Sequence, residues 1–289
     1  MHRPASFMHA PSPALGACLM AGIERDTRGC VLSDGQRFNH YPAVPLACIS
    51  WVFEGTLHMV EDRGPGAPPT LGPALPRLAF SGPQRAPFAS WSPGGVHALS
   101  VGFYPEAMGR LIGQPIGPWL DQHVPLEAVA PPALVRVCQA VLDAGGMAPF
   151  SVLEAQLQGL WRGPAQAGLA PYLGDWVRSV ATRAAHSTAG QGLRQLQRRV
   201  RGWTGQSHRD LQRFVRVEEA FIRHVETEGG SAPDLAAIAA DAGFADQSHM
   251  GREIRRVTGW PPARFGERLA HDEAFWYYRL MAGELGRSR

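Results

Sequence analysis

Two segments in the C-terminal third of the chain repeat one another at an offset of 54 residues. Residues 196–205 (LQRRVRGWTG) align with residues 250–259 (MGREIRRVTG), and both segments end in Thr-Gly. The apolar residues occupy the same three positions, i, i+4 and i+7, which is the spacing of one buried stripe on an α-helix. A duplication of this kind indicates two copies of one supersecondary unit. The repeat therefore predicts that this part of the chain is helical and that one motif occurs in it twice.

The second copy is complete enough to be interpreted as a helix-turn-helix. Residues 231–234 (SAPD) resemble a capping box that opens a first helix. Gly243 can take a positive φ in a tight turn, and Phe244 is expected to fill the angle between the two helices. Asp246 is placed to cap a second helix that runs to about Thr258. The stretch between the two copies, His208–Glu226, has helical periodicity and is predicted to link them.

Positive charge is concentrated around the first copy. The chain has a net charge of only +3 and contains no lysine, and its first 149 residues carry 9 arginines and 10 acidic residues. Between Arg178 and Val217, by contrast, nine arginines stand against one acidic residue, Asp210. A local field of this sign attracts polyanions, and the guanidinium group can make bidentate contacts with phosphate or guanine. The charge distribution therefore points to a nucleic-acid partner for the helical region.

The second copy resembles the signature of AraC/XylS-type transcription regulators. The matching stretches are residues 234–239 (DLAAIA), 243–249 (GFADQSH) and 258–265 (TGWPPARF), in the order and spacing of that family. The whole resemblance covers roughly residues 170–268. It implies two helix-turn-helix units joined by one linker helix, with both recognition helices entering successive major grooves on one face of double-stranded DNA. It also implies RNA polymerase as a partner.

The exposed polar side chains of the two repeated helices are the candidate DNA contacts. The first copy departs from the family pattern, because Gly192 stands where relatives usually have a capping Ser or Thr. We therefore expect the first helix to contact phosphates more than bases, with Arg198 reaching a base and Arg201 a phosphate. The candidates are Arg194, Gln197, Arg198 and Arg201 on the first helix, and Gln247, Ser248, His249, Arg252 and Arg255 on the second.

The first 150 residues are predicted to form a β-rich domain, compatible with a small barrel. Short apolar stretches separated by Pro and Gly predict four strands, and helical spacing begins at Pro105. The expected fold class is α+β multidomain: residues 1–150 as a β-rich sensing or dimerisation domain, 151–168 as a helical linker, and 169–289 as the DNA-binding domain with a C-terminal helical extension. The aromatic run 275–278 (FWYY) is expected to pack in that extension or to form an interface. The predicted strands are Cys48–Glu54, Leu57–Glu61, Arg77–Phe80 and His97–Phe103.

The role of the β-rich domain stays open at this point. We expect an effector or a second copy of the chain to act there, and we interpret its aromatic side chains as core, with a ligand pocket as the alternative. His40, His58 and His97 lie in or beside strands and could converge on a metal, although their spacing matches no metal motif. GxSxG, P-loop and GxGxxG motifs are absent, so we expect neither an enzyme nor a cofactor. The aromatic residues in question are Trp51, Phe53, Phe80, Trp91 and Phe103.

Two alternatives therefore accompany the regulator interpretation. One is a metal-binding or enzymatic β-barrel fused to a DNA-binding module. The other is a protein-interaction adaptor whose divergent first unit no longer binds DNA.

Cysteine usage and hydropathy point to the cytoplasm. Cys18, Cys30, Cys48 and Cys138 form no CxxC pair, and their spacing matches no zinc site, so we expect buried or half-buried thiols. The apolar patch 14–23 is a poor secretion signal, and no stretch approaches the roughly 18 apolar residues of a membrane-spanning helix.

Overall fold

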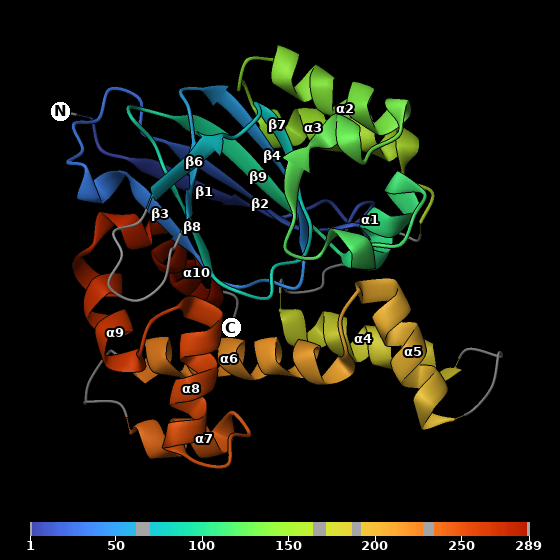
Figure 1. The fold of residues 1–289 in the computed structure, drawn as a ribbon, viewed down its shortest axis with the longest axis vertical. Coiled ribbons are helices and arrows are strands. Elements are labelled where there is room, and N and C mark those ends of the chain that lie inside the picture. The colour runs from blue at the N-terminus through green and yellow to red at the C-terminus, as the bar shows by residue number, and fades with distance from the viewer. Residues whose placement is uncertain (1, 62–69, 164–171, 187–191, 228–233, 288–289) are drawn as a thin grey trace.

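The computed structural model describes residues 2–61, 70–163, 172–186, 192–227 and 234–287. Strands and a few helices make up the N-terminal half, and helices alone make up the described part after residue 172. The α+β fold class predicted from the sequence is therefore confirmed, with a β-rich region followed by an all-helical one (Figure 1).

Ten strands in the described part of the chain form two antiparallel sheets. The six-stranded sheet has the order β1-β2-β9-β4-β7-β10, and the four-stranded sheet has the order β3-β8-β5-β6. The described strands thus form two separate sheets rather than one closed barrel. The larger sheet contains β1 (Ala5–His9), β2 (Leu19–Asp26), β4 (Ala47–Glu54), β7 (Leu78–Ser81), β9 (His97–Phe103) and β10 (His123–Pro125). The smaller sheet contains β3 (Phe38–Tyr41), β5 (His58–Glu61), β6 (Thr70–Ala74) and β8 (Phe88–Trp91).

The four strands predicted from the sequence are all present, as β4, β5, β7 and β9, with ends that differ by at most one residue. The other six strands were not predicted. Among them, β2 includes the second half of the apolar patch 14–23, and it lies between the edge strand β1 and β9 in the larger sheet. Strands β3 (FNHY) and β8 (FASW) interrupt their apolar residues with polar ones and show no continuous apolar run.

Three helices, α1 (Pro105–Ile112), α2 (Pro132–Asp143) and α3 (Pro149–Leu160), pack with one face of the larger sheet. Alternate residues of β4 and β9 point into this core. Trp51 is fully buried there, and its indole Nε1 donates to the backbone oxygen of Cys138 at 2.9 Å. Phe80 and Phe103 are also fully buried and Phe53 is 9% exposed, which confirms these four aromatic residues as core, whereas Trp91 is only partly buried.

Helix α3 belongs to the same core. Leu153 and Leu157 are fully buried, and the Phe150 ring lies so close to Gly22 of β2 that a Cβ at Gly22 would sit 2.4 Å from it. Much of the segment 151–168, which was predicted to be a helical linker, is thus packed on the sheet.

Seven helices follow. Helix α6 is 20 residues long, and Figure 1 shows α4 and α5 at one of its ends and α7 and α8 at the other. It coincides with the predicted linker helix His208–Glu226 to within one residue. The seven are α4 (Leu173–His186), α5 (Leu193–Thr204), α6 (His208–Thr227), α7 (Leu235–Asp241), α8 (Gln247–Thr258), α9 (Pro262–His271) and α10 (Trp276–Arg287).

The buried side chains of these helices fall into three clusters. Val180, Val200 and Leu211 of α4, α5 and α6 join the core of the larger sheet. A second cluster fills the space between α6, α7 and α8. A third joins α9 to the C-terminal segment, where Phe275 is fully buried. The aromatic run 275–278 therefore packs against the protein, as expected for an extension helix.

All four cysteines are free thiols, with Cys18 and Cys138 buried and Cys30 and Cys48 partly buried. Burial raises the pKa of Cys48 and that of Cys138 to about 12, so both stay protonated near neutral pH. No helix in the described part of the chain combines the length and the apolar character needed to cross a membrane.

Candidate nucleic-acid interface

Helix α7 opens the second helix-turn-helix unit at a capped N-terminus. The Asp234 carboxylate accepts hydrogen bonds from the backbone N–H groups of Ala236 at 2.9 Å and Ala237 at 3.2 Å. Asp234 is therefore the cap itself, one of the residue types that best satisfies the free N–H groups of a first helical turn. Of the capping box predicted over residues 231–234, Asp234 is described and caps the helix that begins at Leu235, and residues 231–233 lie outside the described part of the chain.

The turn between α7 and α8 has the predicted geometry. Gly243 has a φ of +73°, a conformation that L-residues with a side chain rarely adopt. Phe244 is buried in the second cluster, and the guanidinium of Arg216 on α6 lies 5.6 Å from its ring centre. Asp246 then caps α8 by accepting from the N–H of His249 at 2.6 Å. The second recognition helix is thus fixed at its start by a side chain.

The first unit, α4 and α5, lacks such a cap. Gly192 occupies the N-cap position of α5 and, having no side chain, supplies no acceptor of its own to the first N–H groups. The next residue, Leu193, is 72% exposed. The departure from the family pattern noted in the sequence therefore falls at the cap, and α5 nevertheless forms a helix of 12 residues.

The two recognition helices end in the same way. Thr204 Oγ1 donates to Val200 O at 2.7 Å and accepts from Gln206 N at 3.2 Å. Thr258 repeats both bonds, with Ile254 O at 2.9 Å and Trp260 N at 3.1 Å. The following glycines, at positions 205 and 259, have φ values of +74° and +84° and close the helices in the left-handed conformation. The sequence repeat thus corresponds to one local structure formed twice.

The structure exposes eight of the nine predicted contact residues. On α5 and α8 they lie opposite the apolar stripes, in which Val200, Met250 and Val257 are buried. Within the described part of the chain, their side chains make no hydrogen bond or ion pair with other protein groups. The eight are Arg194, Gln197, Arg198 and Arg201 on α5, and Gln247, Ser248, Arg252 and Arg255 on α8.

His249 differs from the other eight. Its ring packs edge-on against Phe244 with the ring centres 5.5 Å apart, and the backbone N–H of Ala245 donates to its Nδ1 at 3.4 Å. The side chain is partly buried and supports the turn. The structure therefore places His249 beside the expected surface rather than on it.

Other arginines of the basic stretch hold the fold together. Arg183 pairs with Glu106 of α1, and Arg199 donates to the backbone oxygen of Ala184 at 2.7 Å. Arg213 pairs with Asp210 at 3.2 Å and with Glu253, and so joins α6 to α8. Sequence proximity alone could not separate these side chains from the exposed ones.

Arg256 and Arg209 are among the exposed arginines that were not predicted as contacts. Arg256 follows Arg252 by one helical turn on α8, and Arg209 lies at the start of α6. Both are exposed. The spacing of four residues between Arg252 and Arg256 was a usable signal for a shared face.

Glu218 of α6 holds the first unit through its backbone. Its carboxylate accepts from the N–H of Leu173 at 2.9 and 3.1 Å, at the N-terminus of α4. Burial raises the pKa of Glu218 to about 7, although these backbone bonds and a further one from Gly174 act in the opposite direction. The linker helix therefore carries an acid that changes its charge near neutral pH.

The three histidines considered for a metal site have separate environments. His97 is buried and bonds Glu24 at 2.8 Å, and His58 Nδ1 lies 3.0 Å from Gly72 O. His40 packs among aromatic rings, at 5.1 Å from Phe275. Over the residues that the structure describes, no group of three or more His, Cys, Asp or Glu side chains could hold a metal ion.

A cavity of about 540 Å³ lies between the sheets and the C-terminal helices. Its walls come from β2, β4, β7 and β9 on one side and from α6, α8, α9 and α10 on the other. Of the five aromatic residues considered as an alternative pocket lining, only Trp51 lines this cavity.

Comparison with known proteins agrees with the geometry of the helical region. Residues 187–268, from the segment before α5 to α9, match the family model described as a helix-turn-helix domain. None of the curated proteins matches the chain.

Among solved structures, ToxT from Vibrio cholerae O395 is similar at 9% identity, over 91% of this chain and 96% of that one, with a TM-score of 0.36. Unsaturated fatty acid bound wild-type ToxT from Vibrio cholerae strain SCE256 is similar at 11% identity, over 92% and 96%, with a TM-score of 0.37. TM-scores this low do not establish a common fold. The family match, the repeated units and the linker helix together show that the C-terminal part of the chain is an AraC-type double helix-turn-helix domain.

Proposed function

We propose that this protein is a sequence-specific transcription regulator that binds two successive major grooves of double-stranded DNA, one with α5 and one with α8. The observation that carries the proposal is the two rows of exposed arginines at equivalent positions of the two helices, which have no partner among the described residues. Arg198 corresponds to Arg252, and Arg201 corresponds to Arg255. Guanidinium groups that no protein carboxylate neutralises are available to phosphates and to guanine edges.

The linker helix supports the proposed spacing. Its 20 residues correspond to a length of about 30 Å at 1.5 Å per residue. Successive major grooves on one face of B-DNA recur at about 34 Å, so units held at the two ends of α6 have a separation of the right order.

The two units are proposed to differ in how they contact DNA. The capped α8 presents Gln247, Ser248 and Arg252 near its N-terminus, where a recognition helix meets base edges. The uncapped α5 is proposed to use Arg198 on a base and Arg201 on a phosphate. Arg194, Gln197 and Arg255 complete the proposed surface, and Arg256 joins it from the structure.

Regulation is proposed to come from an effector at the β-rich region and from contact with RNA polymerase. Non-covalent binding accounts for the whole activity, so no catalytic step is assigned. The domain division follows the same proposal, with residues 1–150 as the sensing part and residues 169–289 as the DNA-binding part.

Selection of binding sites from random duplexes with the full chain tests this function. The expected result is an enriched site with two half-sites about one helical turn apart. Arg201→Ala is expected to lower the slope of log affinity against log salt by about one, because one phosphate contact is lost. Arg178→Ala, which removes an arginine paired with Asp175 at 2.6 Å, is the control and should leave the slope unchanged. Equal binding to all duplexes would contradict sequence-specific recognition.

A further inference from the structure

The cavity between the sheets and the helices exists because one face of the larger sheet carries small side chains. Along β9, Ala98, Ser100 and Gly102 face the cavity, whereas Leu99 and Val101 face the helix-covered core and are fully buried. Neighbouring strands continue the small face with Ser50 and Ala79 among others. Side chains alternate between the two faces of a strand, so this pattern leaves space on one side only. The volume of about 540 Å³ falls within the range of about 300–1,000 Å³ typical of small-molecule sites.

The opposite wall belongs to the DNA-binding part of the chain. Val217 of α6, Ile254 of α8 and Pro262 of α9 face the cavity, together with Tyr277 and Met281 of α10. A molecule bound there would contact the β-rich region and the second helix-turn-helix unit at once.

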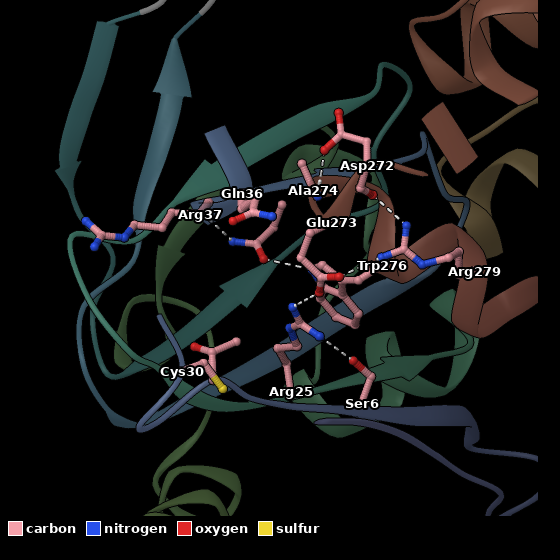
Figure 2. A network of polar contacts seen from close by, with 12 residues as sticks. Ser6, Arg25, Cys30, Gln36, Arg37, Asp272, Glu273, Ala274, Trp276 and Arg279 are labelled. Atoms are coloured by element: carbon pink, nitrogen blue, oxygen red, sulfur yellow. Dashed lines mark hydrogen bonds and ion pairs between the residues drawn. The ribbon is translucent and has the colours of Figure 1, made fainter. Parts of the chain in front are cut away.

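Arg25 is the one arginine among the described residues that line the cavity, and it is already neutralised. Arg25 donates through Nη2 to Glu273 at 2.5 Å and through Nη1 to Ser6 at 2.8 Å, and its guanidinium lies 4.8 Å from the centre of the Trp276 ring. Figure 2 shows this arrangement, with Arg25 between Ser6, Glu273 and Trp276. Arg279 also donates to Glu273, at 2.9 Å. An anionic ligand would have to compete with the Glu273 carboxylate for the same cation.

The other titratable groups along the wall add little charge. His123 shares a hydrogen bond with Ser81 at 2.8 Å, and burial lowers the pKa of its ring, which favours the neutral form. Burial raises the pKa of Tyr41 to about 12 and that of Glu218 to about 7. His224 of α6 also faces the cavity and is engaged in an interaction of its own. A buried charge without a partner is costly, so this wall disfavours a charged guest.

Two hydroxyls offer a neutral polar contact. Ser50 Oγ and Ser100 Oγ lie 2.8 Å apart on adjacent strands, and Ser100 is exposed toward the cavity. A hydrogen bond between two hydroxyls uses one hydrogen and leaves the other, with free lone pairs, for a third group.

We propose that this cavity binds an uncharged, largely apolar small molecule that carries one neutral hydrogen-bonding group directed at the Ser50–Ser100 pair. The assignment rests on the proposed function, because it names the chemical class of the effector. It excludes carboxylates and sulfonates from the site as long as Glu273 neutralises Arg25.

Two dyes with the same aromatic frame test the assignment on the full-length protein. Phenylnaphthylamine is neutral, and anilinonaphthalene sulfonate adds one negative charge. We expect the neutral dye to bind at one site per chain, with an affinity at least about tenfold higher than that of the sulfonate. Glu273→Gln removes the competing charge and should raise the affinity of the sulfonate toward that of the neutral dye.

Substitutions that place larger side chains in the cavity test whether the dye binds there. Ser100→Phe, or Ala98→Leu if the first variant does not fold, should weaken binding of the neutral dye by about tenfold or more. Ser151→Phe, on an exposed position of α3, is the matched control and should leave binding unchanged. The proposal is overturned if the sulfonate binds the unmodified protein as well as the neutral dye does, or if folded filling variants retain full binding.

The same preparations are assayed for duplex binding without dye. If the protein binds DNA but does not prefer the neutral dye, only the assignment of the ligand class is contradicted. Dye binding without any DNA binding would remove the proposed function alone.

Discussion

At the scale of single residues, the two recognition helices differ in how their N-termini are held. Asp246 caps α8, whereas Gly192 supplies no side chain to α5. A Gly cap is weaker than a side-chain cap by only a few tenths of a kcal/mol, so α5 forms all the same. The difference concerns precision rather than stability, because a helix fixed at its start holds its first side chains in a defined position.

Arg252 is the residue for which base recognition is most specifically expected. Replacement by Ala should relax the sequence preference and reduce affinity for the selected site by about 1–3 kcal/mol, because a bidentate contact with guanine is lost. The measurement is affinity for the selected duplex and for variants with one changed base pair. A loss of equal size on every duplex would instead identify Arg252 as a phosphate contact.

Phe244 is expected to be the residue on which the second unit depends most. It is 5% exposed and packs against Arg216 and His249. Phe244→Ala should lower the free energy of unfolding by about 3–5 kcal/mol, because a large side chain is removed from a packed core. Phe7→Ala, at a phenylalanine that is 52% exposed on β1, is the control and should have a much smaller effect in denaturant titration.

At the scale of elements, α6 does more than separate the two units. It receives the N-terminus of α4 on Glu218, holds α8 through Arg213 and Glu253, and contributes Phe214 and Val217 to the second core. Each unit is thus attached to the linker by a polar contact as well as by apolar packing. This arrangement fixes the position of both recognition helices relative to one rigid rod.

Glu218 makes the stability of this arrangement depend on pH. Its pKa is about 7 in the folded protein and near 4.5 when unperturbed, so the folded state binds the proton more tightly. The stability that the protonated acid contributes is present in full below pH 4.5 and is lost as pH rises to about 7. That difference corresponds to roughly 3 kcal/mol as an upper estimate. Glu218→Gln should remove this component.

The measurement is the free energy of unfolding of both proteins between pH 5 and pH 8. The difference between the unmodified protein and the variant is the informative quantity, since histidines that titrate in this range are common to both. A pH-independent difference would contradict the assignment.

At the scale of the whole molecule, the β-rich region contacts both helix-turn-helix units, in each case at the C-terminal end of the second helix of the unit. Gly205, the glycine that closes α5, packs closely against Gly117. A Cβ at position 205 would lie only 3.1 Å from the Cα of Gly117. At the end of α8, Ala43 N donates to Val257 O at 2.7 Å. The C-terminal helix adds a second hold, because Trp276 Nε1 donates to Asn39 at 2.7 Å while Tyr278 packs on Phe265 of α9. The orientation of the second unit therefore depends on the β-rich region.

Trp276→Ala should weaken the contact between the C-terminal helix and the β-rich region specifically. The variant loses the Asn39 bond and the Arg25 contact, so amide hydrogen exchange is expected to accelerate in α8 and α9. Trp203→Ala is the matched control, because Trp203 packs with the first cluster on α5 and its loss should affect α4 and α5 instead. Identical exchange patterns in the two variants would show that Trp276 does not stabilise α8 and α9 specifically.

Some of this architecture follows from local properties of the chain. Periodicity, the capping aspartate 246, the turn glycine 243 and the Thr-Gly helix ends act over a few residues. The helix-turn-helix units, the linker helix and the exposure of eight candidate contact residues could therefore be predicted. Four strands with clear apolar patterns could be predicted for the same reason.

The remaining features depend on residues far apart in the chain. Arg198 and Arg199 are adjacent, and only packing decides that one is exposed while the other bonds Ala184. His249 turns onto Phe244, short strands such as β3 acquire partners, and α3 packs on a sheet rather than linking two domains. The cavity and the neutralisation of Arg25 by Glu273, 248 residues away, arise only when the ends of the chain meet. Contacts at that separation leave no periodic trace, because they are selected by shape and charge in the folded state rather than by neighbours along the backbone.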